Sequence, residues 1–552
     1  MKNNYKQNDL SLYAICIFTA LGLLAVCSKS SPLYPLNDWP DVNCFHTVGK
    51  GIIHGKVPYV DLLEQKGPYV YFLGAIAYLM DGRGFAGYFL FEIISMYFFL
   101  LYAYKISDLY CRPPGFAVMP PGKHLAGGLQ SGCTANLTVR SIYCSRTRTW
   151  LLPLLGAAVV SAKSFVHGGS WEQISLGIFA YAIYSLLAAM RGENLDSRTL
   201  VLNGFLAGFI FWSKFNLVGL YIAWVLVVAL WYLHQRRWKV LGKAALIFAG
   251  GCTAATLLPL IYFGVHGAVK PWLKVYLYDN IFSYGFNSAA PGEAVNLWKR
   301  CASVLENTVR SLADRGNLGY SLPLFFGICF FLLAPLYRIS LWEKLAVCFM
   351  GMGLAGGIFI GSMRHDYYGL PLAVFAIWGI WLGSILVERA ECLLKGLPLC
   401  RKRGQAEMIL WGATLLCTMY LSYCISPNTY LLLADKDDMP QYRFAERILA
   451  SDDISLLNYL FLDGGFYTVT GGVPTEKTFC LLNADRYNRM LEQQEYIRQQ
   501  RTHWVVTWLA QEASEEQLRS LDTVSEYYDL ADYMYFYFEG DNRTYALYEK
   551  KD

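Results

Sequence analysis

The stretch LVGLYIAWVLVVALWYL, residues 217–233, and the stretch HQRRWK that follows it, residues 234–239, decide the fold class of this chain. The first stretch carries no charged residue, and the second carries three cationic side chains. In a bilayer only helices and closed barrels satisfy their backbone hydrogen bonds, and the apolar run is too long for a barrel strand of roughly ten residues. The two stretches together predict a membrane-spanning helix whose basic end lies in the cytoplasm.

The composition of the whole chain agrees with a membrane protein. Of its 552 residues, 55% are hydrophobic and 16% are charged, whereas about 25% charged residues are usual in a soluble domain. The net charge of +5 comes from basic residues clustered between apolar runs, which is the positive-inside pattern and argues against a nucleic-acid partner. The fifteen cysteines include no C-x-x-C pair, so the sequence indicates neither a zinc site nor a disulfide framework.

The apolar runs predict an α-helical polytopic protein with eleven full spans. A further run, 68–80, has about 13 residues against the roughly 20 that a crossing needs, and we expect it to dip into the membrane and return. With the basic linkers inside, the N-terminus lies inside and the C-terminus outside. The expected spans are 10–27, 85–104, 150–165, 174–190, 199–213, 217–233, 241–263, 321–337, 344–361, 370–387 and 407–424. The outer face then receives 28–67, 166–173, 264–320, 362–369 and the chain after about residue 426.

The sequence divides into a membrane domain, 1–425, and a small extracytoplasmic α/β domain, 426–552. In the second domain an amphipathic run predicts a helix at Tyr487–Arg501. β structure is expected in three β-rich stretches, Ser455–Leu462, His503–Trp508 and Tyr533–Tyr548. The stretch Cys111–Arg148 is irregular and rich in small polar residues, and we assign it no function.

The first outer loop, 28–67, carries the densest set of polar motifs in the chain. They are NDWPDVNCF at 37–45, GKVPYVD at 55–61 and, at the edge of the next apolar run, KGP at 66–68. Transfer of a sugar from a lipid phosphate needs a base for the attacking hydroxyl and a cation for the departing phosphate. Asp38, Asp41 or Asp61 could be the base and Lys66 the cation, and solvated loop charges are the alternative.

In these motifs the chain resembles the GT-C glycosyltransferases, the clan that holds protein O-mannosyltransferases and bacterial lipid A aminoarabinose transferases. Members show an aspartate at the start of a helix after the first span, then G-x-x-P-Y-x-D, then K-[GP]-P. Asp41, 55–61 and 66–68 match these elements in order, which implies that Asp41 is the catalytic aspartate. Many members have a second acid directly after it, where this chain has Val42. No metal ligand is therefore assigned, and a divalent metal stays open.

Other polar residues on the expected outer face complete the candidate site. Glu172, in HGGSWEQ at 167–173, is expected to contact the acceptor or to assist the base, with an ordinary acidic loop as the alternative. Lys214 lies at the outer interface against the positive-inside preference, so we expect it to hold a lipid phosphate unless it merely snorkels. In RHDYY, 364–368, the resemblance implies donor-phosphate binding by Arg364, His365 and Tyr367. Glu92, an acid inside an apolar run, is interpreted as structural.

These observations favour an integral membrane glycosyltransferase of the bacterial cytoplasmic membrane. It would move a sugar from a polyprenyl-phosphate donor to a glycan, lipid or protein acceptor on the outer side, with inversion and with Asp41 as general base. Two alternatives remain. One is a transporter or flippase of lipid-linked sugars, for which an internal repeat would be expected. The other is a non-catalytic membrane protein that binds envelope glycans.

Overall fold

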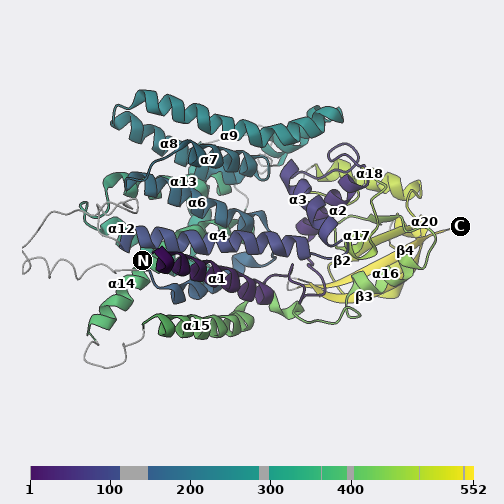
Figure 1. Ribbon diagram of the computed structural model, residues 1–552. Helices are drawn as coiled ribbons and strands as arrows, with labels where there is room; N and C mark the ends of the chain where they lie inside the picture. The colour runs from purple at the N-terminus through teal and green to yellow at the C-terminus, as the bar shows by residue number, and fades with distance from the viewer. Residues whose placement is uncertain are drawn as a thin grey trace, which may run out of the picture.

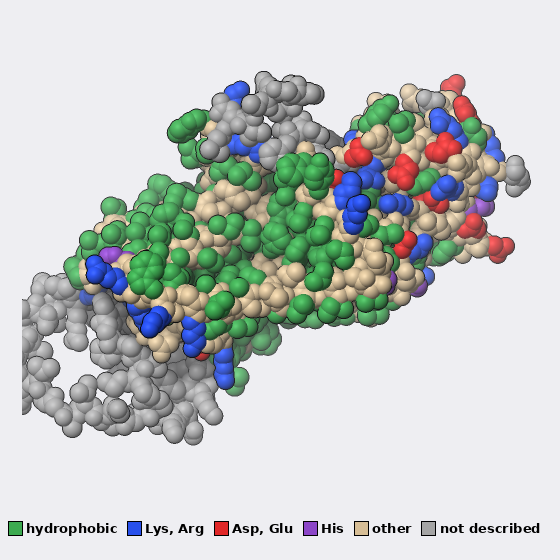
Figure 2. All heavy atoms as spheres, turned by 90° about the horizontal axis from the view of Figure 1, so that it is seen from above, with side chains coloured by type: hydrophobic (Ala, Val, Ile, Leu, Met, Phe, Trp, Pro, Cys, Tyr) green, Lys and Arg blue, Asp and Glu red, His purple; other side chains and the backbone are tan. Residues whose placement is uncertain are grey.

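The computed structural model describes residues 2–111, 147–284, 297–361, 364–393, 403–483, 485–521, 523–538 and 541–551. Most of the irregular stretch after Cys111 therefore lies outside the described residues. Figure 1 shows a bundle of long helices with a small sheet at one end, close to the C-terminus. In Figure 2 hydrophobic side chains cover the bundle, whereas charged side chains of both signs gather over the C-terminal domain. This division is typical of a protein whose bundle faces lipid.

Within the described residues, nine helical segments are long and apolar enough to cross a membrane. They lie in α1 (Lys2–Cys27), α4 (Ala86–Cys111), α6 (Trp171–Met190), η4 with α8 (Phe215–Val218, Gly219–His234), α9 (Trp238–Val265), η6 with α12 (Arg315–Asn317, Leu318–Leu333), α13 (Leu341–Phe359), η7 with α14 (Asp366–Ala376, Ile377–Leu393) and α15 (Arg403–Ile425). Three apolar helices are shorter: α3 (Pro68–Met80), η2 with α5 (Thr149–Leu151, Leu152–Val160) and α7 (Ser197–Phe211). The expected polytopic α-helical class is confirmed. Each of the twelve expected apolar runs contains a helix, but the helices at the expected full spans 150–165 and 199–213 are shorter than the nine long segments.

Small residues allow the helices of the bundle to approach closely. A Cβ atom on Gly219 of α8 would lie 2.0 Å from the carbonyl oxygen of Gly353 in α13. A Cβ atom on Gly204 of α7 would lie 2.1 Å from the carbonyl oxygen of Phe248 in α9. In lipid there is little hydrophobic drive between helices, so close van der Waals packing of this kind supplies much of the association.

Short helices occupy the end of the bundle that faces the C-terminal domain. They are α2 (Pro40–Ile53), η3 (Lys163–Phe165), α10 (Val269–Leu273), the π-helix η5 (Lys274–Tyr284) and α11 (Leu297–Ala313). The short apolar helix α3 lies beside α2 at this end (Figure 1), and a Cβ atom on Gly49 of α2 would come within 2.2 Å of the backbone of Gly74 in α3. This position fits a segment that dips into the membrane rather than one that crosses it.

The C-terminal domain is a four-stranded sheet with short helices around it. The sheet order is β1-β2-β4-β3; β1 and β2 are parallel, and the other two pairs are antiparallel. Its strands are β1 (Leu456–Asn458), β2 (Trp504–Leu509), β3 (Tyr528–Phe538) and β4 (Asp541–Lys550), and its helices are η8 (Thr429–Leu431), α16 (Pro440–Leu449), α17 (Phe466–Thr470), α18 (Arg486–Arg498), α19 (Glu515–Arg519) and α20 (Val524–Tyr527).

The expected β-rich stretch Tyr533–Tyr548 is confirmed as β structure and belongs to the antiparallel pair β3 and β4. The other two β-rich stretches contain β1 and β2, and the expected helix corresponds to α18, with bounds that differ by a few residues.

Two buried carboxylates hold the loop 28–67 in place. The Lys29 ammonium lies 2.6 Å from Asp38 Oδ1, with both side chains fully buried, and the hydroxyl of Tyr430 donates to Asp38 Oδ2 at 2.6 Å. Glu92 of α4 accepts hydrogen bonds from the hydroxyl of Ser28 and from the backbone N–H of Gly169. Asp38 and Glu92 therefore connect the loop to the C-terminal domain and to the segment before α6.

Replacing Asp38 by alanine leaves the buried Lys29 ammonium without its counter-ion. We expect a loss of about 3–5 kcal/mol in the free energy of unfolding, seen as a lower Tm of the purified protein in detergent. Asp438→Ala removes an exposed carboxylate from the C-terminal domain and is the matched control, with an expected change within about 0.5 kcal/mol. Equal Tm values for Asp38→Ala and the wild type would contradict the structural role given to this pair.

Candidate active site

A cavity of about 510 Å³ lies where the bundle meets the C-terminal domain. This volume is within the range of roughly 300–1,000 Å³ that is usual for small-molecule sites. Its wall takes residues from the loop 28–67, the segment 166–173, the turn after α7, η5, α11, the segment 357–368 and the C-terminal domain. The polar residues of the wall include Asp41, Glu64, Gln65, Lys66, His167, Ser213, Lys214, Asn216, Asn280, Arg300, His365 and Asn483. Four segments far apart in the sequence, expected on one face of the membrane, thus converge on one cavity with the C-terminal domain.

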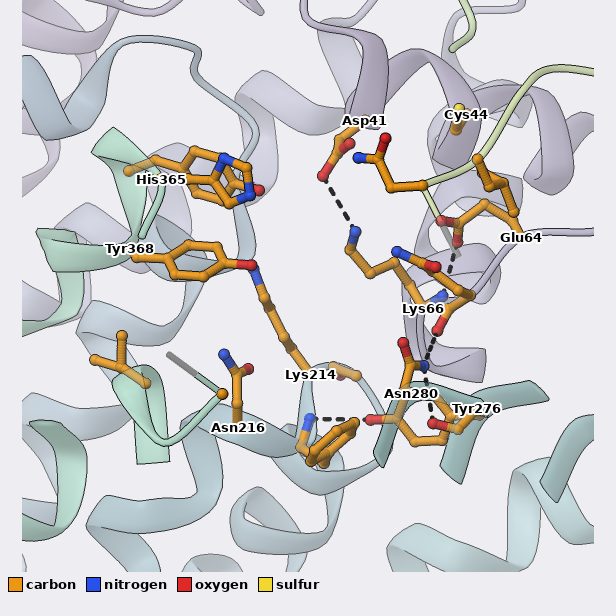
Figure 3. A pocket seen from close by; sticks show the side chains of 18 of the residues that line it. Asp41, Cys44, Glu64, Lys66, Lys214, Asn216, Tyr276, Asn280, His365 and Tyr368 are labelled. Carbon is orange, nitrogen blue, oxygen red and sulfur yellow. Dashed lines mark hydrogen bonds and ion pairs between the residues drawn. The ribbon is translucent and has the colours of Figure 1, made fainter. Parts of the chain in front are cut away.

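Asp41 is placed by the start of α2. Trp39 is the N-cap residue and Pro40 the first residue of the helix, so the Asp41 carboxylate lies in the first turn, where the helix dipole favours a negative charge. The Lys66 ammonium donates to Asp41 Oδ2 at 3.2 Å, and both side chains remain accessible, at 17% for Lys66 and 19% for Asp41. Figure 3 shows this pair on one side of the cavity, opposite His365 and Tyr368.

The KGP motif docks the start of α3 onto the turn after α7. The backbone N–H of Gly67 donates to the carbonyl of Ser213 at 3.0 Å, and that of Tyr69 donates to the carbonyl of Trp212 at 3.3 Å. A Cβ atom at Gly67 would lie 2.1 Å from the Trp212 carbonyl oxygen, so only glycine fits there. This docking brings the Lys66 segment next to Lys214.

The GKVPYVD motif builds a tight turn and does not reach the cavity with its acid. Asp61 Oδ2 accepts from the backbone N–H of Val57 at 2.7 Å, and Asp61 is not among the residues of the cavity wall. The turn holds Tyr59 at a positive φ of 69°, and the Tyr59 hydroxyl donates to the carbonyl of Lys66 at 2.7 Å. The motif therefore stabilises the backbone of Lys66 through the Tyr59 hydrogen bond.

Lys214, which lines the cavity, forms a second ion pair with Glu172, which is not among the residues of the cavity wall. Glu172 lies in the first turn of α6 and is 2% exposed in its side chain, and the Lys214 ammonium donates to its Oε1. The same ammonium lies 5.1 Å and 4.9 Å from the ring centroids of Tyr367 and Tyr368. Lys214 therefore does not snorkel into water, because acidic and aromatic groups hold it in the cavity wall.

Aromatic rings and histidines form another part of the wall. The rings of Trp39 and His167 stack with centroids 4.8 Å apart, and Tyr367 packs edge-on against Trp39 at 5.4 Å. Burial lowers the pKa of His167 well below its usual range, and the nearby Lys29 charge adds to this effect. Burial also lowers the pKa of His365. The neutral imidazoles and the phenol hydroxyls can donate hydrogen bonds without adding charge.

Of the two arginines near this end of the bundle, the structure places Arg300 at the cavity and Arg364 outside it. Arg364 is exposed and is not among the wall residues, whereas Arg300 of α11 is one of them. The Arg300 guanidinium also donates to the carbonyl of Ile360 at 3.3 Å. Sequence reasoning missed Arg300, although the amphipathic run that carries it was a usable signal.

Two further polar residues of the wall were also missed. Glu64 is 3% exposed, and its Oε2 accepts from the backbone N–H of Lys66 at 2.8 Å and from the hydroxyl of Tyr71. Asn280 donates to the carbonyl of Gln65 at 2.6 Å. Glu64 lies two residues before the KGP motif, so its closeness to that motif could have identified it as a wall residue. Nothing in the sequence around Asn280 indicated that this residue lines the cavity. Among the described residues, no three or more His, Cys, Asp or Glu side chains form a group that could hold a metal ion.

The comparisons with known proteins identify the fold. No family model and no curated protein matches this chain. Two crystal structures of ArnT from Cupriavidus metallidurans do match it at 10% sequence identity. The match to the apo structure covers 99% of this chain and 98% of the ArnT chain, with a TM-score of 0.53. The match to the structure bound to undecaprenyl phosphate covers 98% of this chain and 97% of the ArnT chain, with a TM-score of 0.51. The likeness shows that this chain has the fold of these ArnT structures over nearly its whole length.

The buried imidazole of His167 predicts a pH dependence of stability. Since the pKa of His167 is lowered from 6.5 in the folded protein, only the unfolded chain binds a proton there just below pH 6.5. The neutral His167 therefore makes its full contribution to the free energy of unfolding above pH 6.5. Below this pH the contribution decreases by about 1.4 kcal/mol per pH unit. We expect Tm to fall less steeply between pH 6.5 and 5 in His167→Gln than in the wild type. The exposed His234→Gln is the control, and equal slopes in all three proteins would contradict a buried neutral His167.

Proposed function

We propose that this chain is an integral membrane glycosyltransferase that takes a sugar from a polyprenyl-phosphate donor. The observation that carries the proposal is the convergence of Asp41 with Lys66, Lys214 and Arg300 on one cavity at the end of an apolar bundle. A carboxylate beside several cations suits a reaction that removes a proton and releases a phosphate. The match to ArnT bound to undecaprenyl phosphate supports a lipid-linked donor.

The cavity and the C-terminal domain face the outside in this proposal. The exposed residues Arg236 and Arg237 lie in the linker after α8, and the exposed Lys239 lies in the first turn of α9. Figure 2 shows Lys and Arg side chains at the end of the bundle away from the C-terminal domain. The positive-inside rule puts that end in the cytoplasm. Nucleotide sugars are absent on the other side, whereas the chain of a lipid donor can lie between helices. A bacterial cytoplasmic membrane fits this arrangement.

In the proposed reaction the acceptor hydroxyl attacks the anomeric carbon of the donor. The bond from that carbon to the phosphate oxygen breaks, its electron pair leaves with polyprenyl phosphate, and the hydroxyl proton passes to Asp41. Direct displacement of this kind inverts the anomeric centre. The donor phosphate would compete with Asp41 for the Lys66 ammonium, so donor binding would free the carboxylate to act as a base.

The remaining residues take supporting roles in the proposal. Glu172 would orient Lys214 toward the phosphate, and His365 and Tyr367 would donate hydrogen bonds to it or to the sugar. Asp61 would act through the turn that supports Lys66. Arg364 would reach a donor only from outside the wall that the structure shows.

Asp41→Asn keeps the shape of the side chain and removes its basicity. We expect donor binding to be retained and transfer of radiolabelled sugar from a panel of polyprenyl-phosphate donors to fall by about 10²–10⁴-fold. Asp435→Asn, an exposed carboxylate of the C-terminal domain, is the matched control and should transfer like the wild type. Equal transfer by Asp41→Asn and the wild type would move the base elsewhere. No transfer from any donor by the wild type would reject the proposed activity.

Lys214 is expected to hold the phosphate, so its removal should weaken donor binding. In the double variant Lys214→Met with Glu172→Gln, no buried carboxylate is left unpaired. We expect its Kd for polyprenyl phosphate to rise by about 10-fold or more, because one charge-assisted hydrogen bond is lost. Lys477→Met removes an exposed lysine and should leave the Kd unchanged. An unchanged Kd in the double variant would show that Lys214 does not bind the phosphate.

A further inference from the structure

Two cysteines meet at the buried contact between α2 and the C-terminal domain. Cys44 lies on α2, three residues after Asp41, and Cys480 lies in the domain, 436 residues further along the chain. Their Sγ atoms are 3.7 Å apart, and each residue is only 1% exposed. The two positions belong to no common sequence motif.

Hydrogen bonds around Cys44 fix this contact in register. One turn further along α2, the Thr47 hydroxyl donates to Asp463 Oδ2 at 2.6 Å, and the Lys50 ammonium then donates to the carbonyl of Tyr467 at 2.5 Å. On the other side of Cys44, the Thr468 hydroxyl donates to Asn43 Oδ1 at 2.9 Å. The two sulfur atoms are therefore held opposite each other by bonds that do not involve them.

We propose that Cys44 and Cys480 form a disulfide bond that joins α2 to the C-terminal domain. The S–S bond is about 2.05 Å long, so the sulfur atoms need to approach by roughly 1.7 Å, which small rotations of the two side chains supply. The proposal rests on the outer location given to this domain above, because disulfides form and persist in oxidising compartments. A single cross-link of this kind has no spacing motif, which is why the sequence indicated no disulfide framework.

The cross-link would form by thiol–disulfide exchange with a protein or small-molecule disulfide. One thiolate attacks the oxidant to give a mixed disulfide, the second displaces the oxidant's sulfur, and two thiols of the reduced oxidant are released with both protons. Burial raises the pKa of both cysteines, so few thiolates exist once the domain has docked. Oxidation therefore belongs to folding, before docking is complete, and burial then protects the bond from reductants.

The bond would stabilise the wall of the cavity. Cys44 itself lines the cavity, as do Leu482 and Asn483, two and three residues after Cys480. A covalent connection would hold this segment against the helix that carries Asp41. It would do so whatever substrate the cavity accepts.

Tryptic cleavage isolates the two cysteines in separate short peptides. Residues 30–50 contain Cys44 and residues 478–486 contain Cys480, each as the only cysteine of its peptide. The full chain is expressed in its membrane, free thiols are blocked with an alkylating reagent in denaturant, and the digest is examined by mass spectrometry without and with reduction. We expect one cross-linked species that separates into the two peptides on reduction. Both peptides recovered fully alkylated before reduction would overturn the proposal.

Single variants and hydrogen exchange complete the test. In Cys480→Ser the cross-linked species should disappear and Cys44 should become open to alkylation, whereas Cys301→Ser, at an exposed position, should keep it. Reduction of the purified wild type should increase hydrogen exchange in 478–486. Persistence of the Cys44 cross-link in Cys480→Ser would show a different partner and overturn the assignment. Because none of these measurements uses a sugar donor, their failure would leave the proposed transfer activity untouched.

Discussion

The backbone contact between Gly67 and the turn after α7 determines the geometry of the cavity. The Trp212 carbonyl lies where any side chain at position 67 would have its Cβ atom, so this approach exists only because the residue is glycine. It places Lys66 at the start of α3 and Lys214 in the facing turn, both of which line the cavity. Two ammonium groups in the wall of one cavity repel each other. The position of their counter-charges therefore decides whether the site is stable.

Each of the two lysines has its own carboxylate. Asp41 accepts from Lys66 at a partly accessible position, and Glu172 accepts from Lys214 at a buried one. The buried pair is expensive to break, whereas the accessible pair can exchange partners with an arriving anion at lower cost. In the proposed reaction, this difference would keep the Lys214 ammonium in place and let the Lys66 ammonium move to the donor phosphate. It would also let Asp41, which is paired with Lys66 in this structure, act as a base once a donor phosphate binds.

The sequence allowed a correct prediction of the fold class and of the segments that converge on the cavity. Long apolar runs predict helices reliably, because a backbone in hydrocarbon must satisfy its own hydrogen bonds. The basic residues at one end of such runs then predict which segments share a face of the membrane. The position of Asp41 at the start of a helix was also predictable, through the proline before it and the motifs after it. The spacing could not show that Asp61 closes a turn, because a carboxylate that caps a backbone N–H and one that faces a cavity look alike in a motif.

The contributions of distant helices escaped prediction for a different reason. Arg364 and Arg300 both lie near the cavity, and only the course of α11 decides which of them lines it. Likewise, the contact between Cys44 and Cys480 depends on how the C-terminal domain docks on α2, and this docking leaves no local pattern.

The most direct test of the central claim is a structure of the protein with undecaprenyl phosphate bound. The account predicts the phosphate between Lys66 and Lys214, with the Lys66 ammonium moved from Asp41 toward it and the Asp41 carboxylate facing the open part of the cavity. A phosphate bound away from both lysines, with the Asp41–Lys66 pair intact, would contradict it.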